Sequence, residues 1–245
     1  MQHISRYFIS ISLLFFIFQT SSQEKAKDSI AKNTIREVDS IVYKQPYGLR
    51  IGVDISKPIL HQFNDKYNGL EFVTDCRISK RVYVAAEFGF EEEKSNEDFT
   101  NSTAIGSYAR VGVNYNQFNN WLDMNNELFT GFRYGYARFK QTLHSYTPNV
   151  TDAQNGIYFP IQEVFVDETT EGLNAHWLEL VIGVKVEVYH NLFLSLSGAY
   201  KIMVNVSDPE NFTSLFSPGF NRIFESNTGF GFNYSISYLI PLKKK

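Results

Sequence analysis

The chain has 245 residues, a net charge of −3 and a single cysteine, Cys76. The near-neutral charge excludes nucleic acid as the expected partner, and one cysteine excludes an intrachain disulfide or a cysteine-based zinc site. Aromatic residues make up 16 % of the chain, yet the mean hydropathy of −0.24 excludes a bundle of membrane-spanning helices.

Residues 1–22 have the pattern of a cleaved signal peptide. Arg6 is followed by the apolar run Tyr7–Phe18 and then by small residues at 20–22. A membrane anchor is the alternative, but the run is too short to span a bilayer comfortably as a helix. Residues 23–46 are polar and mixed in charge, and they predict a periplasmic leader. The mature protein is therefore expected to be exported.

Residues 47–242 alternate between apolar and polar side chains with a period of two, which predicts strands. The expected strands cover residues 47–56, 68–78, 82–91, 108–115, 128–137, 178–188, 192–204 and 230–240. Long polar loops are expected at 57–67, 92–103, 141–175 and 205–227, with a connector at 116–125 and a small extra hairpin at 158–166.

The clearest pair of strands is the hairpin Leu178–Val204. One face of each strand is almost wholly apolar, and Tyr189–Asn191 is the break between them. Strands in soluble sheets average about five or six residues, whereas a strand that crosses a bilayer at a tilt needs about nine to eleven. The length of this hairpin favours a membrane barrel.

The fold class that follows is all-β: an eight-stranded antiparallel transmembrane β-barrel with up-and-down topology. Short and long connections alternate along the chain, so that every long loop falls on one side. Bacterial outer-membrane barrels have this asymmetry, with short periplasmic turns and long extracellular loops. Localisation in the cell outer membrane follows from this interpretation.

The charged side chains of the strands, Glu91 among them, lie on the faces opposite the apolar ones. The apolar faces carry almost no charge until Arg138 and Lys140, at the outer end of the fifth strand. A basic side chain that faces mid-bilayer lipid costs about 2–4 kcal/mol, so the charged faces must point inward. The predicted interior polar network consists of Arg50, Asp54, Glu71, Asp75, Arg77, Glu87, Arg110, Arg133, Glu179, Lys185, Glu187 and Lys201. Because an eight-stranded barrel is filled by its own side chains, we expect a plugged core rather than a pore.

Several stretches resemble known barrels: Tyr47–Asp54, Gly131–Gly135, Ala175–Glu179, Pro218–Arg222 and Gly231–Leu242. Through them the chain resembles the small OmpX/OmpA-type outer-membrane barrels of Gram-negative bacteria. It is more closely similar to an uncharacterised barrel family of unknown function. The resemblance implies a fold and a location, and it brings no catalytic residues.

No sequence motif indicates a nucleophile elbow, a phosphate-binding loop or a zinc site. We therefore expect no catalytic residue, metal or cofactor, and Cys76 on an apolar strand face favours packing over catalysis. The histidines His61, His144 and His176 lie in or beside the long loops. His176 is the one candidate for an outer site, with Asp167, Glu168 or Glu171.

The sequence favours a non-enzymatic, monomeric outer-membrane protein that acts as a structural or surface-interaction protein through its outer loops. Its expected partners are outer-membrane lipid, the barrel-assembly machinery during insertion, and an unidentified extracellular ligand or protein. Three alternatives stay open. They are a barrel enzyme that acts on lipid or peptide near His144 and His176, a small-solute channel, and a soluble lipocalin-like barrel with its apolar residues turned inward.

Overall fold

The computed structural model describes residues 46–118, 125–148, 163–210 and 212–244. The predicted signal peptide, the predicted leader up to residue 45, most of the 116–125 connector and most of the extra hairpin lie outside these residues. The elements are β1 (Pro46–Asp54), α2 (Ser56–Phe63), β2 (Tyr67–Arg77), β3 (Val82–Glu97), β4 (Thr100–Asn116), β5 (Glu127–Tyr146), β6 (Val164–Tyr189), β7 (Leu192–Val206), β8 (Phe216–Ser217), β9 (Asn221–Arg222) and β10 (Thr228–Lys244).

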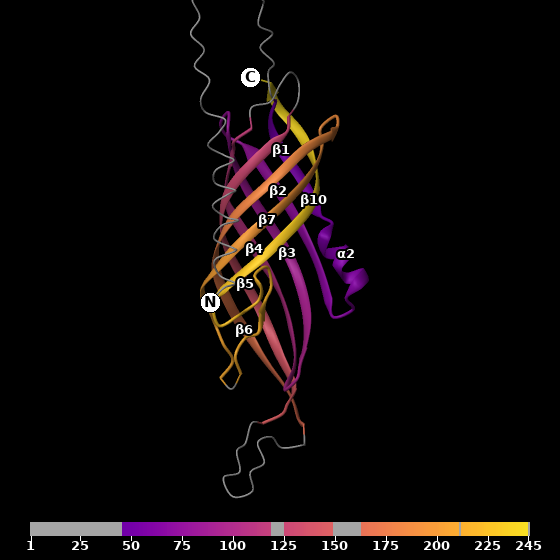
Figure 1. The fold of residues 1–245 in the computed structure, drawn as a ribbon, viewed down its shortest axis with the longest axis vertical. Helices are drawn as coiled ribbons and strands as arrows, with labels where there is room; N and C mark the ends of the chain where they lie inside the picture. The colour runs from indigo at the N-terminus through magenta and orange to yellow at the C-terminus, as the bar shows by residue number, and fades with distance from the viewer. Residues whose placement is uncertain (1–45, 119–124, 149–162, 211, 245) are drawn as a thin grey trace, which may run out of the picture. The chain divides into compact units, whose positions relative to one another are not determined.

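Eight long strands form one antiparallel sheet in up-and-down order, which confirms the predicted strand topology. Each long strand pairs with its neighbours in sequence, and β1 pairs with both β2 and β10, which closes the sheet into a barrel. The strands are tilted around a common axis (Figure 1). Closure leaves no long open sheet edge, because the first and last strands satisfy each other's backbone groups.

The two ends of the barrel differ. At the turn end, Ile78–Arg81 connects β2 to β3, and His190–Asn191 connects β6 to β7. At the opposite, loop end, the strands run further than the alternation indicated. The expected loop at 92–103 is almost wholly strand, and the expected loop at 141–175 is shortened from both sides by β5 and β6. Polar residues continue these strands because cross-strand hydrogen bonds need no apolar face.

The expected loop at 57–67 was also wrong in part, because Ser56–Phe63 forms the helix α2. Asp54, two residues before Ser56, stabilises the start of this helix, because its carboxylate accepts hydrogen bonds from the Ser56 amide and hydroxyl, both at 2.7 Å. Pro58 is tolerated because it lies in the first turn, where its missing N–H would have no helical partner. Ile59 and Phe63 are exposed, at 48 % and 84 %, so α2 presents apolar side chains away from the barrel.

Helix α2 takes the place of a longer first strand. Asp54, the last residue of β1, pairs with Glu71 and with Ser235. The neighbouring strands continue toward the loop end without a β1 partner, over Tyr67–Leu70 in β2 and Thr228–Tyr234 in β10. The barrel wall therefore has a notch at its loop end, beside α2.

The expected loop at 205–227 contains the short β8–β9 hairpin, which turns back into the barrel mouth. The Gly219 amide donates a hydrogen bond to Glu91 at 2.6 Å, and the Lys201 ammonium donates one to the Gly219 carbonyl at 2.6 Å. The Phe220 side chain is fully buried beside Trp177. This segment closes the loop end with its own side chains, and we call it the plug segment (Phe216–Arg222).

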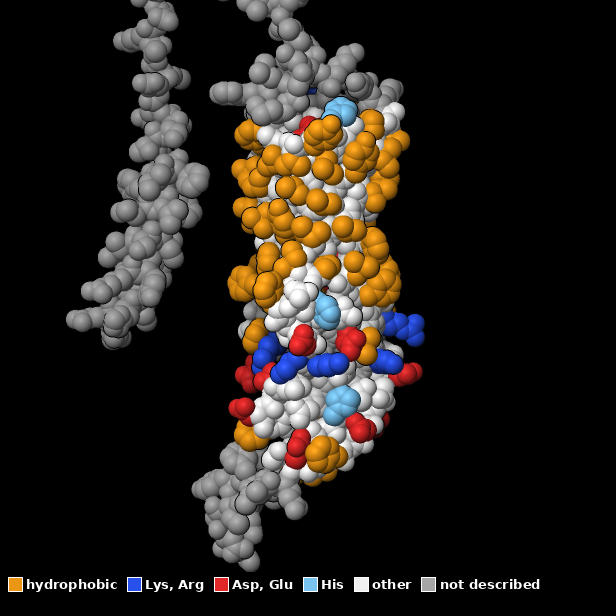
Figure 2. All heavy atoms as spheres, turned by 90° about the vertical axis from the view of Figure 1, so that its right-hand side faces the viewer, with side chains coloured by type: hydrophobic (Ala, Val, Ile, Leu, Met, Phe, Trp, Pro, Cys, Tyr) orange, Lys and Arg blue, Asp and Glu red, His pale blue; other side chains and the backbone are white. Residues whose placement is uncertain are grey.

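The outward faces of the strands form a continuous apolar belt. One outward residue from each long strand illustrates the belt: Ile51, Phe72, Phe88, Val111, Phe132, Ile182, Leu196 and Phe232. The exposed fraction of these side chains lies between 44 % for Phe88 and 62 % for Phe232. Figure 2 shows the belt on the visible face, bounded on one side by a row of basic and acidic side chains, which we call the charged ring.

Among the described residues, none of the helices is both long enough and apolar enough to cross a membrane.

Candidate functional site

The interior of the barrel holds two groups of ion pairs, and the first lies toward the turn end. Arg50 is 2.5 Å from Asp75 and 2.5 Å from Glu127, and Lys185 pairs with the second oxygen of Asp75. All four side chains are less than a tenth exposed. We call them the turn-side cluster, and its two cations and two carboxylates balance each other.

The second group, the mouth-side cluster, lies toward the loop end and centres on Arg110. The Arg110 guanidinium is 2.5 Å from Glu71, 2.8 Å from Glu87 and 3.5 Å from Glu179. Four further members surround these: Arg133 and Lys201 on the strands, Lys57 on α2, and Glu91. Among the described residues this cluster also balances, with four cations against four carboxylates.

Neutral donors complete the mouth-side cluster. Trp177 donates to Glu179 at 2.6 Å, Asn233 donates to Glu71 at 2.7 Å, and Tyr108 also donates to Glu71. Tyr67 donates to Glu91 at 2.9 Å. Buried carboxylates need several donors to offset their lost hydration. The cluster therefore locks side chains from at least six elements into one arrangement.

An apolar layer covers the mouth-side cluster toward the loop end. It consists of Tyr108, Ala137, Phe139, Leu173, Ala175, Trp177, Met203 and Phe220. Trp177 fits because Gly135 faces it: a Cβ atom at position 135 would lie 2.1 Å from the indole ring. Large aromatic side chains therefore point inward together with the ion-paired residues.

The inner cavity beside Arg110 and Lys201 has a volume of about 40 Å³. Such a space holds a few water molecules and no larger solute. Together with the plug segment, the two clusters and the apolar layer fill the described part of the interior.

The structure places nine of the twelve predicted network residues in ion pairs inside the barrel: Arg50, Glu71, Asp75, Glu87, Arg110, Arg133, Glu179, Lys185 and Lys201. Asp54 is buried as predicted, and its carboxylate accepts hydrogen bonds from Ser56 and forms no ion pair with the described residues. The other two predictions need correction. Arg77 donates to the Ser79 and Lys80 carbonyls of the β2–β3 turn. Glu187 accepts hydrogen bonds from Asn125 and the Asn191 amide.

These two corrections share a physical reason. Arg77 and Glu187 face inward by parity, but each lies close to the turn end of its strand. There the backbone of the turn and nearby amides are within reach, so neither side chain needs a charged partner across the barrel.

Sequence reasoning missed Lys57 and Glu127. Glu127 precedes the predicted fifth strand by one residue, and it has the same parity as Phe129 and Arg133 on the inward face. Extending the alternation by one step would have found it. Lys57 had no such signal, because its position follows from the helix α2, which the sequence did not indicate.

The histidines are arranged differently from the sequence hypothesis. His176 contacts outward aromatic residues: its Nδ1 is 2.5 Å from the Tyr134 hydroxyl, and its ring lies 4.9 Å from that of Tyr136. His144 instead joins Thr103 and Asp167, with the Thr103 hydroxyl 2.9 Å from Nε2 and Asp167 2.8 Å from Nδ1. The structure therefore brings Asp167 to His144 and not to His176.

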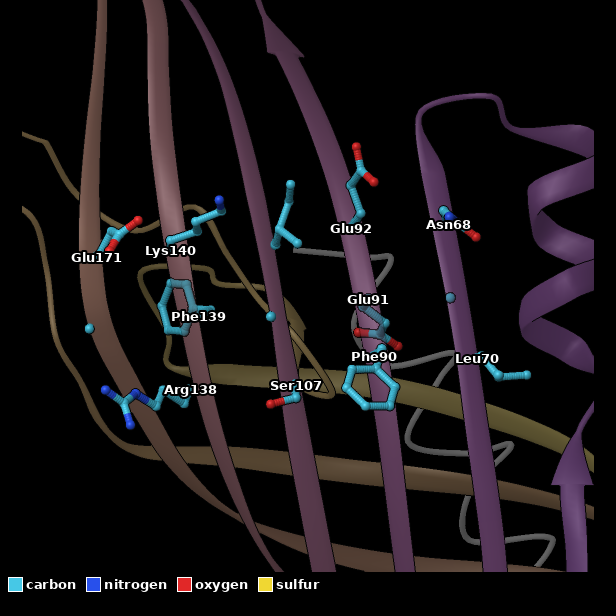
Figure 3. A pocket seen from close by; sticks show the side chains of 14 residues that line it. Asn68, Leu70, Phe90, Glu91, Glu92, Ser107, Arg138, Phe139, Lys140 and Glu171 are labelled. Carbon is cyan, nitrogen blue, oxygen red and sulfur yellow. The ribbon is translucent and has the colours of Figure 1, made fainter.

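A groove of about 620 Å³ crosses the outer wall where the apolar belt meets the charged ring (Figure 3). Leu70, Phe90 and Ile105 supply apolar walls, and Gly106 and Ser107 form a low floor. The polar side chains around it are Asn68, Glu91, Glu92, Arg138, Lys140 and Glu171, of which Glu91 is buried. Figure 3 shows Lys140 leaning toward the groove, whereas Arg138 lies at its edge and points away from Ser107.

A second groove, of about 470 Å³, lies at the notch between α2 and β10. Lys57 and Leu60 line it from α2, Phe230 and Phe232 from β10, and Glu93 from β3. Burial, and then repulsion from Glu91, raise the pKa of Glu93 to about 7. This carboxyl group therefore changes charge near neutral pH.

No group of three or more His, Cys, Asp or Glu side chains in the described part of the chain is arranged to hold a metal ion.

One comparison with known proteins gives a match. The profile of a family described as a domain of unknown function (DUF6048) matches residues 4–245, and the chain therefore belongs to that family. No curated protein and no solved structure matches the chain.

Proposed function

We propose that this member of the DUF6048 family is a monomeric transmembrane β-barrel of the bacterial outer membrane. Its sealed interior makes it a structural or surface-interaction protein that works through its loop end. The single observation that carries the proposal is the continuous belt of exposed apolar side chains on all eight long strands.

The belt is hard to reconcile with water as the surrounding solvent. Leu180, Ile182 and Leu196 are 59 %, 61 % and 56 % exposed in the described monomer. Monomeric soluble proteins rarely expose apolar patches larger than a few hundred Å². Lipid removes this difficulty, because an apolar band about 25 Å tall is what a barrel presents to a bilayer.

The charged ring beside the belt fits a membrane boundary. Arg138 and Lys140 follow Tyr134 and Tyr136 on the outward face of β5, so aromatic side chains give way directly to basic ones. Aromatic girdles followed by charge mark the interface of such barrels. The short turns would face the periplasm, and the loop end would face outward.

The ion-paired interior supports a sealed protein over a channel. Both clusters are charge-balanced, and the cavity beside the mouth-side cluster has room for only a few water molecules. The outward direction of Leu180 and Leu196 also contradicts the lipocalin-like alternative, which required these side chains to line an inner cavity.

The test uses cysteine labelling of the full chain in a Cys76→Ser background. A polarity-sensitive probe at Leu180→Cys or Leu196→Cys should report hydrocarbon after reconstitution into phosphatidylcholine vesicles. The matched probe at the exposed turn residue Lys80→Cys should report water. Protein that stays in solution without detergent, with all three probes in water, would contradict the proposal.

Liposome swelling tests the sealed interior separately. Vesicles that contain the protein should show no more solute flux than empty vesicles. Clear flux of small sugars would contradict the sealed interior and favour the small-solute channel.

Hydrolysis of lipid or peptide is a second candidate function, and the Thr103–His144–Asp167 chain of hydrogen bonds favours it. The order of atoms is that of a nucleophile, a base and an orienting carboxylate. It ranks second because Thr103 is paired on both sides, with Lys94 and Thr142, so its backbone amide is not available as an oxyanion donor.

An esterase assay with p-nitrophenyl esters of several chain lengths tests this second candidate. His144→Ala and Thr103→Val should abolish turnover, while His176→Ala should leave it unchanged. Equal turnover by all variants, or none by the wild type, would remove hydrolysis as a candidate.

A further inference from the structure

The groove on the outer wall is built from two rows of outward side chains that run across β2 to β5. The strand register gives the row nearer the loop end as Asn68, Glu92, Ile105 and Lys140. The register gives the next row as Leu70, Phe90, Ser107 and Arg138. The first row belongs to the charged ring, and the second is where the apolar belt begins.

From the strand register and the side-chain sizes we infer a shallow furrow that leads from this groove into the belt. On β4 the outward residues Ser107 and Ala109 are small, while their neighbours on β3, Phe90 and Phe88, are large and stack edge to face at 4.8 Å. On the other side Tyr136 pairs with Ala109. The small residues thus form a low track between raised aromatic walls, running along β4 from the groove toward the turn end.

Two exposed cations stand where the furrow meets the groove. Arg138 pairs in register with Ser107, and Lys140 pairs with Ile105. Within the described residues neither side chain takes part in an ion pair, in contrast to Lys57, Arg110 and the other cations of the interior. Two basic groups at a membrane boundary without a carboxylate partner are complementary to an anion of the bilayer surface.

We propose that this groove binds a phosphate-bearing lipid, with the phosphate between Arg138 and Lys140 and one acyl chain along Ser107 and Ala109. The inference rests on the proposed membrane insertion. Lys140 already leans toward the groove (Figure 3). Arg138 must turn from the edge, which its exposed and flexible side chain allows.

The shape selects a lipid over a soluble anion, because the cations and the furrow are continuous. A free phosphate would use only the two cations, whereas a lipid also covers Phe88, Phe90 and Tyr136. Glu92 and Glu171 flank the groove. They confine the phosphate to the space beside the cations and can accept hydrogen bonds from headgroup hydroxyl groups.

The experiment is a lipid titration of the full chain in detergent, followed by native mass spectrometry. Dioleoyl phosphatidic acid is the probe, and dioleoyl glycerol is its neutral counterpart. The wild type should bind phosphatidic acid and not the glycerol lipid. The double variant R138A/K140A should bind phosphatidic acid about thirtyfold more weakly, since each basic group near a membrane surface contributes about a fivefold gain.

Two further variants separate the furrow from charge alone. K66A/K80A removes the same net charge from exposed sites elsewhere and should bind like the wild type. S107F fills the furrow without a change in charge and should weaken binding of phosphatidic acid. Its control is G198F on β7, where an added Cβ meets no atom within 4 Å, and it should have no effect.

The outcomes distinguish this inference from the proposed function. If probes at residues 180 and 196 report hydrocarbon but R138A/K140A binds like K66A/K80A, the lipid site is wrong and the membrane barrel stands. Wild-type affinity of S107F, or full displacement of the lipid by millimolar inorganic phosphate, would also overturn the lipid site. If those probes report water, the proposed function itself fails.

Discussion

The inner and outer faces of the same strands differ in both polarity and burial. On β6, Glu179 and Lys185 point inward and are buried in ion pairs, while Leu180 and Val184 point outward and are exposed. Adjacent residues along one strand therefore experience different surroundings. The comparison shows that polarity in this protein is arranged by side of the sheet and not by distance from a centre.

The two faces also tolerate change for different reasons. An inner charge is stable only with its partners, which come from strands far apart in the sequence. An outer residue has few protein partners, and its effect depends on the solvent that it meets. Four substitutions follow from this contrast. Three are compared with a matched control residue, and the fourth is compared with the wild type at two pH values.

Arg110→Met should have the largest effect. It removes the cation that contacts Glu71, Glu87 and Glu179 and leaves buried carboxylates without compensation, which costs about 3–5 kcal/mol. The measurement is guanidinium unfolding in phospholipid vesicles. Lys66→Met, at an exposed turn, should change the free energy of unfolding by less than about 0.5 kcal/mol. Equal stability of the two variants would show that the mouth-side cluster contributes nothing.

Leu180→Lys should come next, because it places a charge in the middle of the outer belt. If lipid surrounds the belt, the free energy of unfolding should fall by about 2–4 kcal/mol. Val204→Lys, at the edge of the belt near the loop end of β7, should cost about 0–1 kcal/mol in the same assay. An equal loss of unfolding free energy at the two positions would contradict the proposed membrane boundary.

Gly219→Ala tests how tightly the plug segment fits. Gly219 and Gly172 share a φ of +78°, but only at Gly219 would a Cβ atom collide, at 2.5 Å from the Tyr108 ring. Gly172→Ala should cost about 1–2 kcal/mol from backbone strain alone. Gly219→Ala should cost about 1–3 kcal/mol more from overpacking. Equal losses in the vesicle unfolding assay would mean that the plug segment is loosely held.

Glu93→Gln should give the smallest effect, and one that depends on pH. Because the pKa of Glu93 is raised from 4.5 to about 7, the folded state favours its protonated form. The stability that this supplies is fully present below about pH 4.5 and is lost as the pH rises through about 7. The glutamine variant should match the wild type at pH 4 and exceed it in stability at pH 8. The same difference at both values would contradict the raised pKa.

Much of the fold could be predicted, because alternation is a local signal. The hairpin of β6 and β7 and the strands β1, β2 and β10 followed from the side on which Leu, Val, Ile and Phe recur. The strand ends at the loop side could not be predicted in the same way. Asn96–Glu97, Thr100–Asn101 and Thr142–Tyr146 carry no continuous apolar face, and only pairing with a neighbour shows them to be strand.

The candidate sites divide similarly. Parity alone indicated which charges face inward, but the partners Arg110–Glu71 and Lys185–Asp75 lie 39 and 110 residues apart in the chain. Such pairs depend on which strands face each other across the closed barrel. The lipid groove likewise required the register that sets Ser107 beside Arg138.

The sequence by itself determined the strand order and the side on which each residue lies, because a strand turns successive side chains to opposite faces wherever it is placed. Only the tertiary structure decided that Lys57 enters the barrel from a helix, that the plug segment closes the mouth, and that Arg138 and Lys140 stand beside an apolar furrow. These arrangements depend on closure of the sheet and on its stagger, and both properties belong to pairs of strands and not to any one segment.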